Sequence, residues 1–396
     1  MSKRSKIINN LILIFSSLTF TLFIGEIGLK ILNISYPSFY KVDSHRGHSL
    51  IQHMFGIWKH EGSASISINK IGLRDKNYTK KKIKDTFRVV VIGDSFAEAI
   101  QLDKDKTFWS LVEQKLSKCQ KLDNKNIEVV NFGVGDYGTA QEYTTLKYYA
   151  SQFHPDLVLL TVFTDNDVVN NSKVLSPEDR FSPFLSLKDN KYNFDMSFRK
   201  TKTYQWRNSF VRKKLFALVN KSHVLQLINQ TRVLINKQHS ETISSEMMKD
   251  EDKLHNLEFI SDLYKKSSAI WQKEWNLTDE SIKLIQQESY MLNSDYLVVT
   301  LSNPIQVYPN FLVRKKYFKD YTIYDQFYPD QRIYKLSRIK DFKVLALAPL
   351  LQTYADKNKV FLHGFNNTKL GNGHWNHFGH QIAGEIISNK ICSLQK

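Results

Sequence analysis

The sequence contains only two cysteines, Cys119 and Cys392, among its 396 residues. Two cysteines exclude a disulfide-rich scaffold, and they exclude a structural zinc cluster built on thiolates. They could still form one disulfide in an oxidising compartment, and the sequence leaves that open. The chain also lacks an internal repeat and any recognisable nucleic-acid-binding signature. We therefore expect an ordinary globular protein with no nucleic-acid partner.

Acidic residues are few in this chain. Asp and Glu total 39 against 56 Lys and Arg, which gives a formal net charge of +17. A basic surface favours anionic partners such as membrane lipid or an acidic polysaccharide. Because the cations are spread widely along the chain, a lysine-rich surface with no specific partner is an equally good interpretation.

Long apolar runs are absent except at the amino terminus. Residues 7–32 are almost entirely apolar and follow the cations Lys3, Arg4 and Lys6. The uninterrupted part, 11–25, is short for a membrane span, but the whole segment is long enough. A cleaved signal peptide is the alternative, although residues 21–30 offer no good pair of small residues for cleavage. We expect residues 1–32 to be an uncleaved single-pass anchor.

The leading cations predict a cytoplasmic amino terminus, so the rest of the chain would lie on the periplasmic side of the inner membrane. Lys30, Lys41 and Arg46 lie on the far side of the uninterrupted apolar part and weaken this charge asymmetry.

After a stalk and lead-in over 33–86, strands and helices alternate from residue 87 to the carboxyl end. Buried-strand patterns occur in five places, at 87–92, 127–130, 157–163, 296–301 and, as a short candidate, 360–362. Residues 342–355 are ambiguous, and their length and apolar spacing favour a helix despite Pro349. Residues 171–290 interrupt the alternation as a mostly helical insertion. The pattern predicts a three-layer, doubly wound parallel sheet of the flavodoxin type in 87–396.

The predicted insertion carries four large side chains that could form a sugar-stacking or lid surface: Trp206, Arg207, Trp271 and Trp275. Aromatic residues at a helical period more often belong to a core, so packing is the favoured interpretation.

Four short blocks lie at the ends of the predicted strands or before the last helix. They are Gly93-Asp94-Ser95-Phe96, Asn131-Phe-Gly-Val-Gly135-Asp136, Asn166-Asp167 and His374-Trp-Asn-His-Phe-Gly-His380. In kind and order they resemble the SGNH/GDSL hydrolase superfamily. The anchor and the form of the last block resemble membrane-anchored bacterial members linked to modification of envelope polysaccharides.

The residues also suggest a chemistry by themselves. A serine hydroxyl is a weak nucleophile until a base takes its proton, and Ser95 and His374 are the expected pair. Acyl transfer also needs donors for the developing oxyanion. The expected donors are the Ser95 N–H, a backbone N–H at Gly135 or Asp136, and the Asn166 side chain; the resemblance implies the same roles. No metal or cofactor is expected, because His377 and His380 lack nearby acidic or cysteine partners.

Two positions depart from the family pattern. Asp136 stands where glycine is usual and brings a carboxylate close to the developing negative charge. Asn372 stands where the resemblance implies a carboxylate that orients the histidine. We therefore expect a Ser95–His374 dyad, with Asn372 or a backbone carbonyl orienting the imidazole and with a lower rate than a full triad would give.

The expected function is a serine-dependent acyl-ester hydrolase or O-acyltransferase acting on O-acetyl groups of an envelope glycan. As a transferase it would need a partner protein to deliver the acyl group, because the chain has no multi-span donor channel. Two alternatives stay open. One is a non-catalytic glycan-binding or scaffold protein that retains the fold, which Asp136 and Asn372 favour. The other is a lipid esterase at the bilayer.

Overall fold

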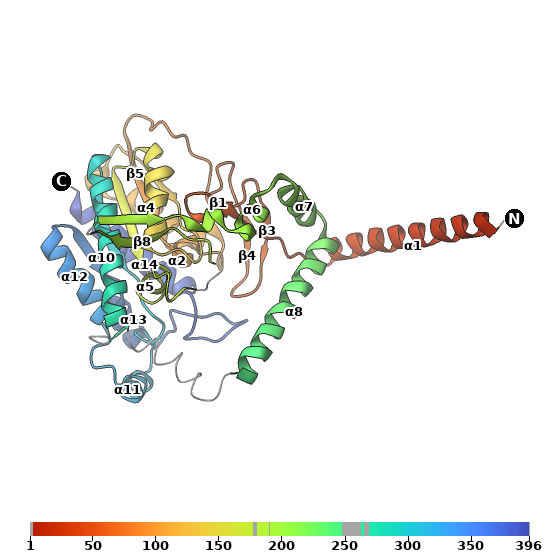
Figure 1. Ribbon diagram of the computed structural model, residues 1–396. Helices are drawn as coiled ribbons and strands as arrows, with labels where there is room; N and C mark the ends of the chain where they lie inside the picture. The colour runs from red at the N-terminus through yellow and green to blue at the C-terminus, as the bar shows by residue number, and fades with distance from the viewer. Residues whose placement is uncertain (1–2, 177–179, 190, 248–262, 265–268, 396) are drawn as a thin grey trace. The chain divides into compact units, whose positions relative to one another are not determined.

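The computed structural model describes residues 3–176, 180–189, 191–247, 263–264 and 269–395. Contacts divide the chain into two compact units (Figure 1). Residues 1–38 and 205–249 form unit 1, whereas residues 39–204 and 250–396 form unit 2.

Unit 2 is built on a five-stranded sheet in the order β11-β10-β7-β5-β6, and every neighbouring pair is parallel. The strands are β5 (Thr86–Ile92), β6 (Asn126–Asn131), β7 (Leu157–Val162), β10 (Asp295–Thr300) and β11 (Lys343–Ala346). In chain order the sheet reads 2-1-3-4-5, the flavodoxin-like arrangement, so the predicted fold class is confirmed.

Alternating strand residues feed two separate cores, because successive side chains point to opposite faces. Val89 and Val91 pack in one core with helices α3, α13 and α14, whereas Val90 and Ile92 pack in the other with α4, α10 and α12. The helices of the first face are α3 (Phe108–Leu116), α13 (Leu347–Asn358) and α14 (His377–Leu394). Those of the second face are α4 (Thr139–Tyr148), α10 (Ala269–Met291) and α12 (Tyr328–Lys340). The sheet and the two sets of helices form the three predicted layers.

The fifth strand differs from the sequence prediction. It is β11, and the helix α13 begins directly after it at Leu347. Pro349 therefore falls in the first helical turn, where its missing N–H costs no helical hydrogen bond. Residues 360–362 form no strand, and His363 instead makes an isolated bridge to Trp375.

Two short hairpins precede the sheet in the segment expected to be a stalk. They are formed by β1 (Tyr40–Asp43) with β2 (Gly47–Leu50) and by β3 (Phe55–Trp58) with β4 (Ala64–Ser67). Their apolar side chains, among them Phe39 and Ile66, pack in a third core with Ile100 and Val134 from the loops after β5 and β6. Residues 39–67 are therefore packed against the main domain.

The segment expected as a helical insertion is more mixed. It contains the hairpin of β8 (Phe184–Lys188) and β9 (Lys191–Asp195) and the helix α6 (Lys202–Asn208). Trp271 and Trp275 belong to α10 and are buried against the sheet, so they form no sugar-stacking surface. Other short elements are α2 (Ser95–Glu98), α5 (Asn166–Asn170), α11 (Phe311–Asp320) and 3-10 turns at Lys104–Lys106, Gln120–Leu122, Ala150–Phe153 and Ser197–Lys200.

Unit 1 consists of α1 (Lys3–Ile31), α7 (Phe210–Lys221), α8 (His223–Met247) and the adjoining part of α6. The segment Lys6–Ile31 is 26 residues long and apolar enough to cross a membrane, by length and composition alone. A signal sequence has the same properties.

Candidate active site

Ser95 lies at the turn between the central strand β5 and the short helix α2. Gly93 makes this turn possible, because a side-chain carbon there would overlap the Thr161 hydroxyl on β7. The Asp94 carboxylate accepts the Phe96 N–H at 2.9 Å and caps α2. Asp94 therefore fixes the backbone that presents the Ser95 hydroxyl at the carboxyl edge of the sheet.

Ser95 and His374 meet although 279 positions separate them, and a third residue joins them. Ser95 Oγ lies 2.8 Å from His374 Nε2. His374 Nδ1 lies 2.5 Å from Glu61 Oε2, and the His374 backbone N–H donates to Glu61 Oε1 at 2.8 Å. Nucleophile, base and carboxylate thus stand in a row, the arrangement of a serine hydrolase triad.

The charges in this row fix the direction of its hydrogen bonds. Burial raises the pKa of the Glu61 carboxyl, but hydrogen bonds from His374 and its charge outweigh burial and leave this pKa lowered. An ionised Glu61 only accepts, so the proton of the neutral ring is on Nδ1 and Nε2 accepts from Ser95. Burial lowers the pKa of His374, yet the hydrogen bond and charge of Glu61 raise it overall. The carboxylate therefore strengthens His374 as a base.

Glu61 is held in the loop between β3 and β4. The Trp58 indole N–H donates to the Glu61 carbonyl at 2.9 Å. The Asn367 side chain pairs with the Gly62 backbone, accepting its N–H at 2.9 Å and donating to its carbonyl at 2.8 Å. Gly373 (φ +72°) lets the carboxylate approach, because a side-chain carbon there would overlap Glu61 Oε1.

Glu61 was missed by the sequence analysis, and the predicted role of Asn372 is wrong in this structure. Asn372 is exposed, and its side-chain oxygen accepts the neighbouring Gly373 N–H at 2.9 Å. It is therefore turned toward its own loop and leaves His374 Nδ1 to Glu61. Glu61 lies 313 positions from His374 and carries no motif, so no local signal could have identified it.

Gly135, one of the expected oxyanion donors, is engaged elsewhere. Its N–H donates to Glu98 Oε2 at 2.5 Å, and the same carboxyl group accepts the Tyr40 hydroxyl at 2.9 and 3.0 Å. Glu98 is fully buried, and burial raises its pKa to about 7. This correction to the predicted site leaves Asp136 as the candidate backbone donor from the loop after β6.

Asp136 and Asn166 lie in the loops that follow the neighbouring strands. Asp136 is exposed with φ +62°, and its carbonyl accepts the Arg180 guanidinium and, at 3.3 Å, the Asn170 side chain. Asn166 begins α5 after β7, and its side-chain oxygen is buried with no hydrogen-bond partner. Ser95, Asp136 and Asn166 thus come from three adjacent strands of one sheet edge.

The other histidines of the last block have structural positions. His380 is buried, and its Nδ1 accepts the Phe108 N–H at 3.2 Å. His377 is exposed at the start of α14. A second serine–histidine contact joins Ser302 Oγ and His363 Nε2 at 2.9 Å, but both residues are buried and His363 Nδ1 bonds the Gly373 carbonyl. His363 therefore supports the loop that carries His374.

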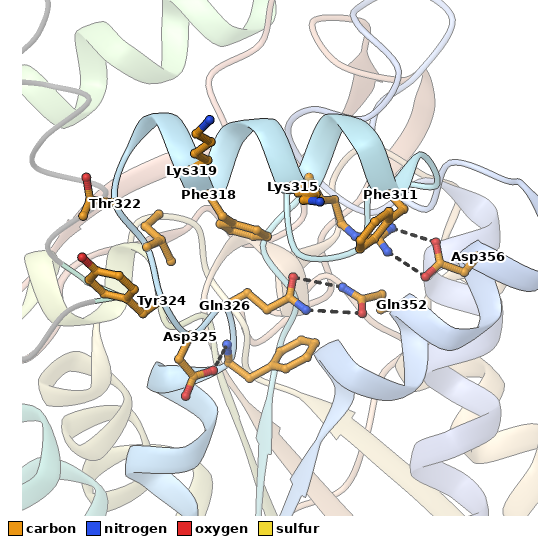
Figure 2. Close-up of a pocket in the computed structure, with 13 residues that line it drawn as sticks. Phe311, Lys315, Phe318, Lys319, Thr322, Tyr324, Asp325, Gln326, Gln352 and Asp356 are labelled. Atoms are coloured by element: carbon orange, nitrogen blue, oxygen red, sulfur yellow. Dashed lines mark hydrogen bonds and ion pairs between the residues drawn. The ribbon is translucent and has the colours of Figure 1, made fainter.

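No three histidine, cysteine, aspartate or glutamate side chains have metal-binding geometry within the described ranges. Figure 2 shows a cavity of about 950 Å³ that is lined largely by α11 and by the segment leading to α12. Its lining includes the aromatic rings of Phe318 and Tyr324 and two lysines, and Arg314 pairs with Asp356 at 2.7 Å. Ser95, His374 and Glu61 do not line this cavity, so the triad geometry alone defines the candidate site.

No family model matches the chain, and no curated protein matches it in sequence. Solved structures similar to it include a lipolytic protein of the G-D-S-L family from Desulfitobacterium hafniense DCB-2, at 13% identity and a TM-score of 0.35, covering 77% of this chain and 99% of that one. An acetyl xylan esterase is 13% identical with a TM-score of 0.38, and the match covers 77% of this chain and 100% of that one. An acetylxylan esterase from Geobacillus stearothermophilus is 10% identical with a TM-score of 0.37, and the match covers 78% of this chain and 96% of that one.

Proposed function

We propose that the chain is a serine-dependent acyl-ester enzyme of the SGNH/GDSL type, with Ser95, His374 and Glu61 as its catalytic triad. The observation that carries the proposal is the continuous row from the Ser95 hydroxyl through His374 to Glu61, with contacts of 2.8 and 2.5 Å. With Glu61 next to His374, the site has the carboxylate that Asn372 lacks. This weakens the alternative of a non-catalytic scaffold, which the presence of Asn372 at the expected carboxylate position had favoured.

In the first half of the reaction, Ser95 Oγ attacks the ester carbonyl carbon while His374 Nε2 takes the hydroxyl proton. The carbonyl π electrons move to the oxygen, and N–H donors at Ser95 and Asp136 with the Asn166 amide stabilise this oxyanion. Collapse breaks the bond to the alcohol, which leaves with the proton from His374. Ser95 then carries the acyl group, and Glu61 has stabilised the transient imidazolium.

In the second half, a hydroxyl attacks the acyl-enzyme, and His374 acts again as base and then acid. Water as the attacking group gives ester hydrolysis, whereas a sugar hydroxyl gives acyl transfer. We propose an O-acetylated envelope glycan as the substrate or acceptor, outside the inner membrane. An apolar amino-terminal helix, a net charge of +17 and a Cys119–Cys392 disulfide support this environment, because disulfides persist in oxidising compartments.

The test is labelling of the full-length protein by a serine-reactive fluorophosphonate. We expect the wild-type protein to be labelled and Ser95→Ala to be unlabelled, with Ser44→Ala, an exposed serine whose hydroxyl also contacts a histidine ring, as the matched control that keeps labelling. Absence of labelling in folded wild-type protein would contradict the proposed nucleophile.

A portion of the same protein that has not been exposed to the probe is then assayed for acetate release from acetylated glycans and for hydrolysis of acetyl and medium-chain esters. Faster cleavage of medium-chain esters would favour the lipid esterase over the glycan enzyme. Acetyl transfer to a glycan in the presence of a donor ester would favour the transferase.

A further inference from the structure

The helices α7 and α8 of unit 1 expose an unusual amount of apolar surface. Exposed apolar residues occur along both helices: Phe210, Val211, Leu215 and Leu218 on α7, and Leu225, Leu227, Ile228, Val233, Leu234 and Ile235 on α8. Ten exposed large apolar side chains on two contacting helices are unusual for a soluble surface, and such exposure usually indicates a binding surface for membrane or protein.

These residues are arranged as amphipathic helices. On α7, Val211, Leu215 and Leu218 are spaced by four and three positions and so share one face. Lys213 falls on the opposite face of the same helix, whereas Lys214 and Lys221 flank the apolar face, and all three lysines are exposed. Apolar residues on one face with lysines beside and opposite them are typical of helices that lie in a membrane interface, because the long lysine side chains reach the headgroups.

The exposed face of α8 is also apolar. Leu227 and Ile228 recur seven positions later as Leu234 and Ile235, which places all four on one side of the helix. The two helices contact each other and are joined at Ser222, so we call them the α7–α8 hairpin.

The α7–α8 hairpin is fixed to the carboxyl end of α1 by the Glu26 side chain. The Glu26 carboxylate accepts the Ser222 hydroxyl at 2.8 Å and the backbone N–H groups of His223 and Val224 at 3.0 and 3.1 Å. Glu26 thereby caps the amino terminus of α8, where a negative charge is favourable.

The chain that follows α1 is tied to the same helices. The Tyr36 N–H donates to the Gln226 side chain at 2.8 Å, and Ser38 exchanges two hydrogen bonds with the Asn220 side chain at 3.1 Å. The hairpin therefore cannot move away from the end of α1 without breaking several contacts.

The length of α1 sets the depth at which this attachment lies. Residues 7–25 extend about 28 Å as a helix, close to the roughly 30 Å hydrocarbon core of a bilayer. A span that fills the core with these residues places Glu26 at the bilayer surface, and with it the start of α8.

We propose that the α7–α8 hairpin lies in the bilayer interface beside the end of α1, with its apolar faces toward the acyl chains and its lysines toward anionic headgroups. The inference rests on α1 spanning the membrane and needs no catalytic activity. The occupant of the apolar surface is a lipid bilayer; a second copy of the chain or another protein is an alternative outcome of the test.

The test uses the full chain with its native disulfide, reconstituted in vesicles of phosphatidylethanolamine and phosphatidylglycerol. Single cysteines are introduced as Leu215→Cys, Ile228→Cys and, as the matched control on the other face of α7, Lys213→Cys. Each is labelled with an environment-sensitive nitrobenzoxadiazole dye, and unmodified protein gives the background. Quenching by lipids with a nitroxide near the top of the acyl chain measures contact with the bilayer.

We expect the labels at Leu215→Cys and Ile228→Cys to lose most of their emission and the label at Lys213→Cys to keep most of it. An Ile14→Cys label in α1 should be quenched by a nitroxide deep in the acyl chain and shows that the span is inserted. Val211→Cys replaces Leu215→Cys if that variant does not fold.

Three results overturn the proposal. The first is water-like emission at Leu215→Cys and Ile228→Cys while Ile14→Cys is quenched, which places the hairpin outside the bilayer. The second is apolar emission without nitroxide quenching, which assigns the surface to a second copy or a protein partner. The third is an unquenched label at Ile14→Cys, which removes the span. A failure of the proposed enzymatic function changes none of these readouts.

Discussion

At the scale of single residues, Glu61 is the group on which the proposed chemistry most depends after Ser95 and His374. It is the hydrogen-bond partner of His374 Nδ1 at 2.5 Å. Replacing such a carboxylate by its amide leaves the shape intact but removes the charge that stabilises the imidazolium and can favour the wrong ring tautomer.

We therefore expect Glu61→Gln to lower kcat for an acetyl ester by a factor on the order of 10³–10⁴. Asn372→Ala is the matched control and should keep near wild-type kcat, because its side chain is turned toward Gly373. Steady-state hydrolysis of p-nitrophenyl acetate measures both. A large loss in Asn372→Ala with little loss in Glu61→Gln would show that the carboxylate is not the orienting group.

The same pair predicts a pH dependence. Glu61 raises the pKa of His374, and only neutral His374 can accept the Ser95 proton. Activity should rise with pH through an inflection above the usual histidine value of about 6.5. Removing the charge in Glu61→Gln should move this inflection to lower pH, which a profile of kcat/KM measures. An inflection that stays in place would mean that another group titrates.

The Glu61–His374 pair also makes folding stability depend on pH. The contribution of His374 is lost as pH rises, whereas that of Glu61 is lost as pH falls. Because the pKa of His374 is raised, its contribution is complete below the unfolded value of about 6.5 and is lost as pH rises through the folded value. Because the pKa of Glu61 is lowered, its contribution is complete above its ordinary value of 4.5 and is lost as pH falls through the folded value. The stabilisation should therefore be largest between these limits and absent in Glu61→Gln.

Sequence reasoning identified Ser95 and His374 because each lies in a short block whose neighbours determine its local geometry. Gly93 and Asp94 shape the turn at Ser95 within four consecutive residues. Glu61 depends instead on tertiary packing of a hairpin loop, which no adjacent residue encodes. The bond from Gly135 to Glu98 was equally hidden, because a glycine N–H gives no indication of which acceptor it meets.

At the scale of elements, the loop between β3 and β4 must be held rigidly for Glu61 to act. Asn367 makes three hydrogen bonds to this loop, two with Gly62 and one to the Lys59 carbonyl at 3.2 Å. Its hydrogen bonds reach the backbone of the Glu61 loop and not Ser95 or His374, so it is a positioning residue.

We expect Asn367→Ala to lower kcat by about tenfold, if loss of these bonds shifts Glu61 at a cost near 1.4 kcal/mol. The neighbouring Asn366→Ala is the control and should leave kcat unchanged. The inflection of the pH profile should move toward that of Glu61→Gln, which a purely structural defect would not cause. An unchanged profile with normal stability would show that the loop holds Glu61 without Asn367.

The disulfide joins the segment after α3 to α14, two helices that pack on the same face of the sheet. The two cysteines are 273 positions apart, so the disulfide restricts a long segment of the unfolded chain. Reduction should therefore lower the free energy of unfolding by about 2–4 kcal/mol. Urea unfolding with and without reductant measures this change. The Cys119→Ser/Cys392→Ser double variant is the control and should not respond to reductant. Equal stability of the oxidised and the reduced wild-type protein would contradict a structural role for the disulfide.

Sequence patterns located the four main strands because buried parallel strands are continuous runs of β-branched residues, as in 87–92. The fifth strand was not predicted because β11 has only four residues, which are half-buried at the sheet edge, and because it runs directly into α13. The hairpins before residue 68 were not predicted as hairpins, because their strands also have only four residues each, although residues 65–69 alternate in a strand-like way and overlap β4.

At the scale of the whole molecule, the chain order conceals which segments belong together. Unit 1 combines residues 1–38 with 205–249, and unit 2 is interrupted by the second of these segments. The sequence indicated an apolar amino terminus and a helical region after residue 200, but no periodicity could indicate that α1 and α8 pair through Glu26. Only a tertiary contact between distant segments defines this unit.

That pairing predicts that the amino-terminal helix is kept in the mature protein. Cleavage within residues 21–30 would remove α1 and could remove Glu26, leaving the first N–H groups of α8 without their carboxylate cap. It would also leave the exposed apolar residues of α7 and α8 without the helix they adjoin.

We therefore expect protein purified from membranes to keep the α1 residues 3–31, as measured by its intact mass and by peptide mapping. Glu26→Ala should not change that mass, but it should increase proteolysis between α7 and α8, because the cap that fixes Ser222 and His223 is lost. Lys30→Ala is the control, because it removes only the exposed ion pair with Glu26 at 3.6 Å and keeps the cap, so it should be cut no faster than wild type. A purified mass that lacks the first twenty to thirty residues would identify α1 as a signal peptide, and the packing of α1 on α8 would then belong only to the precursor.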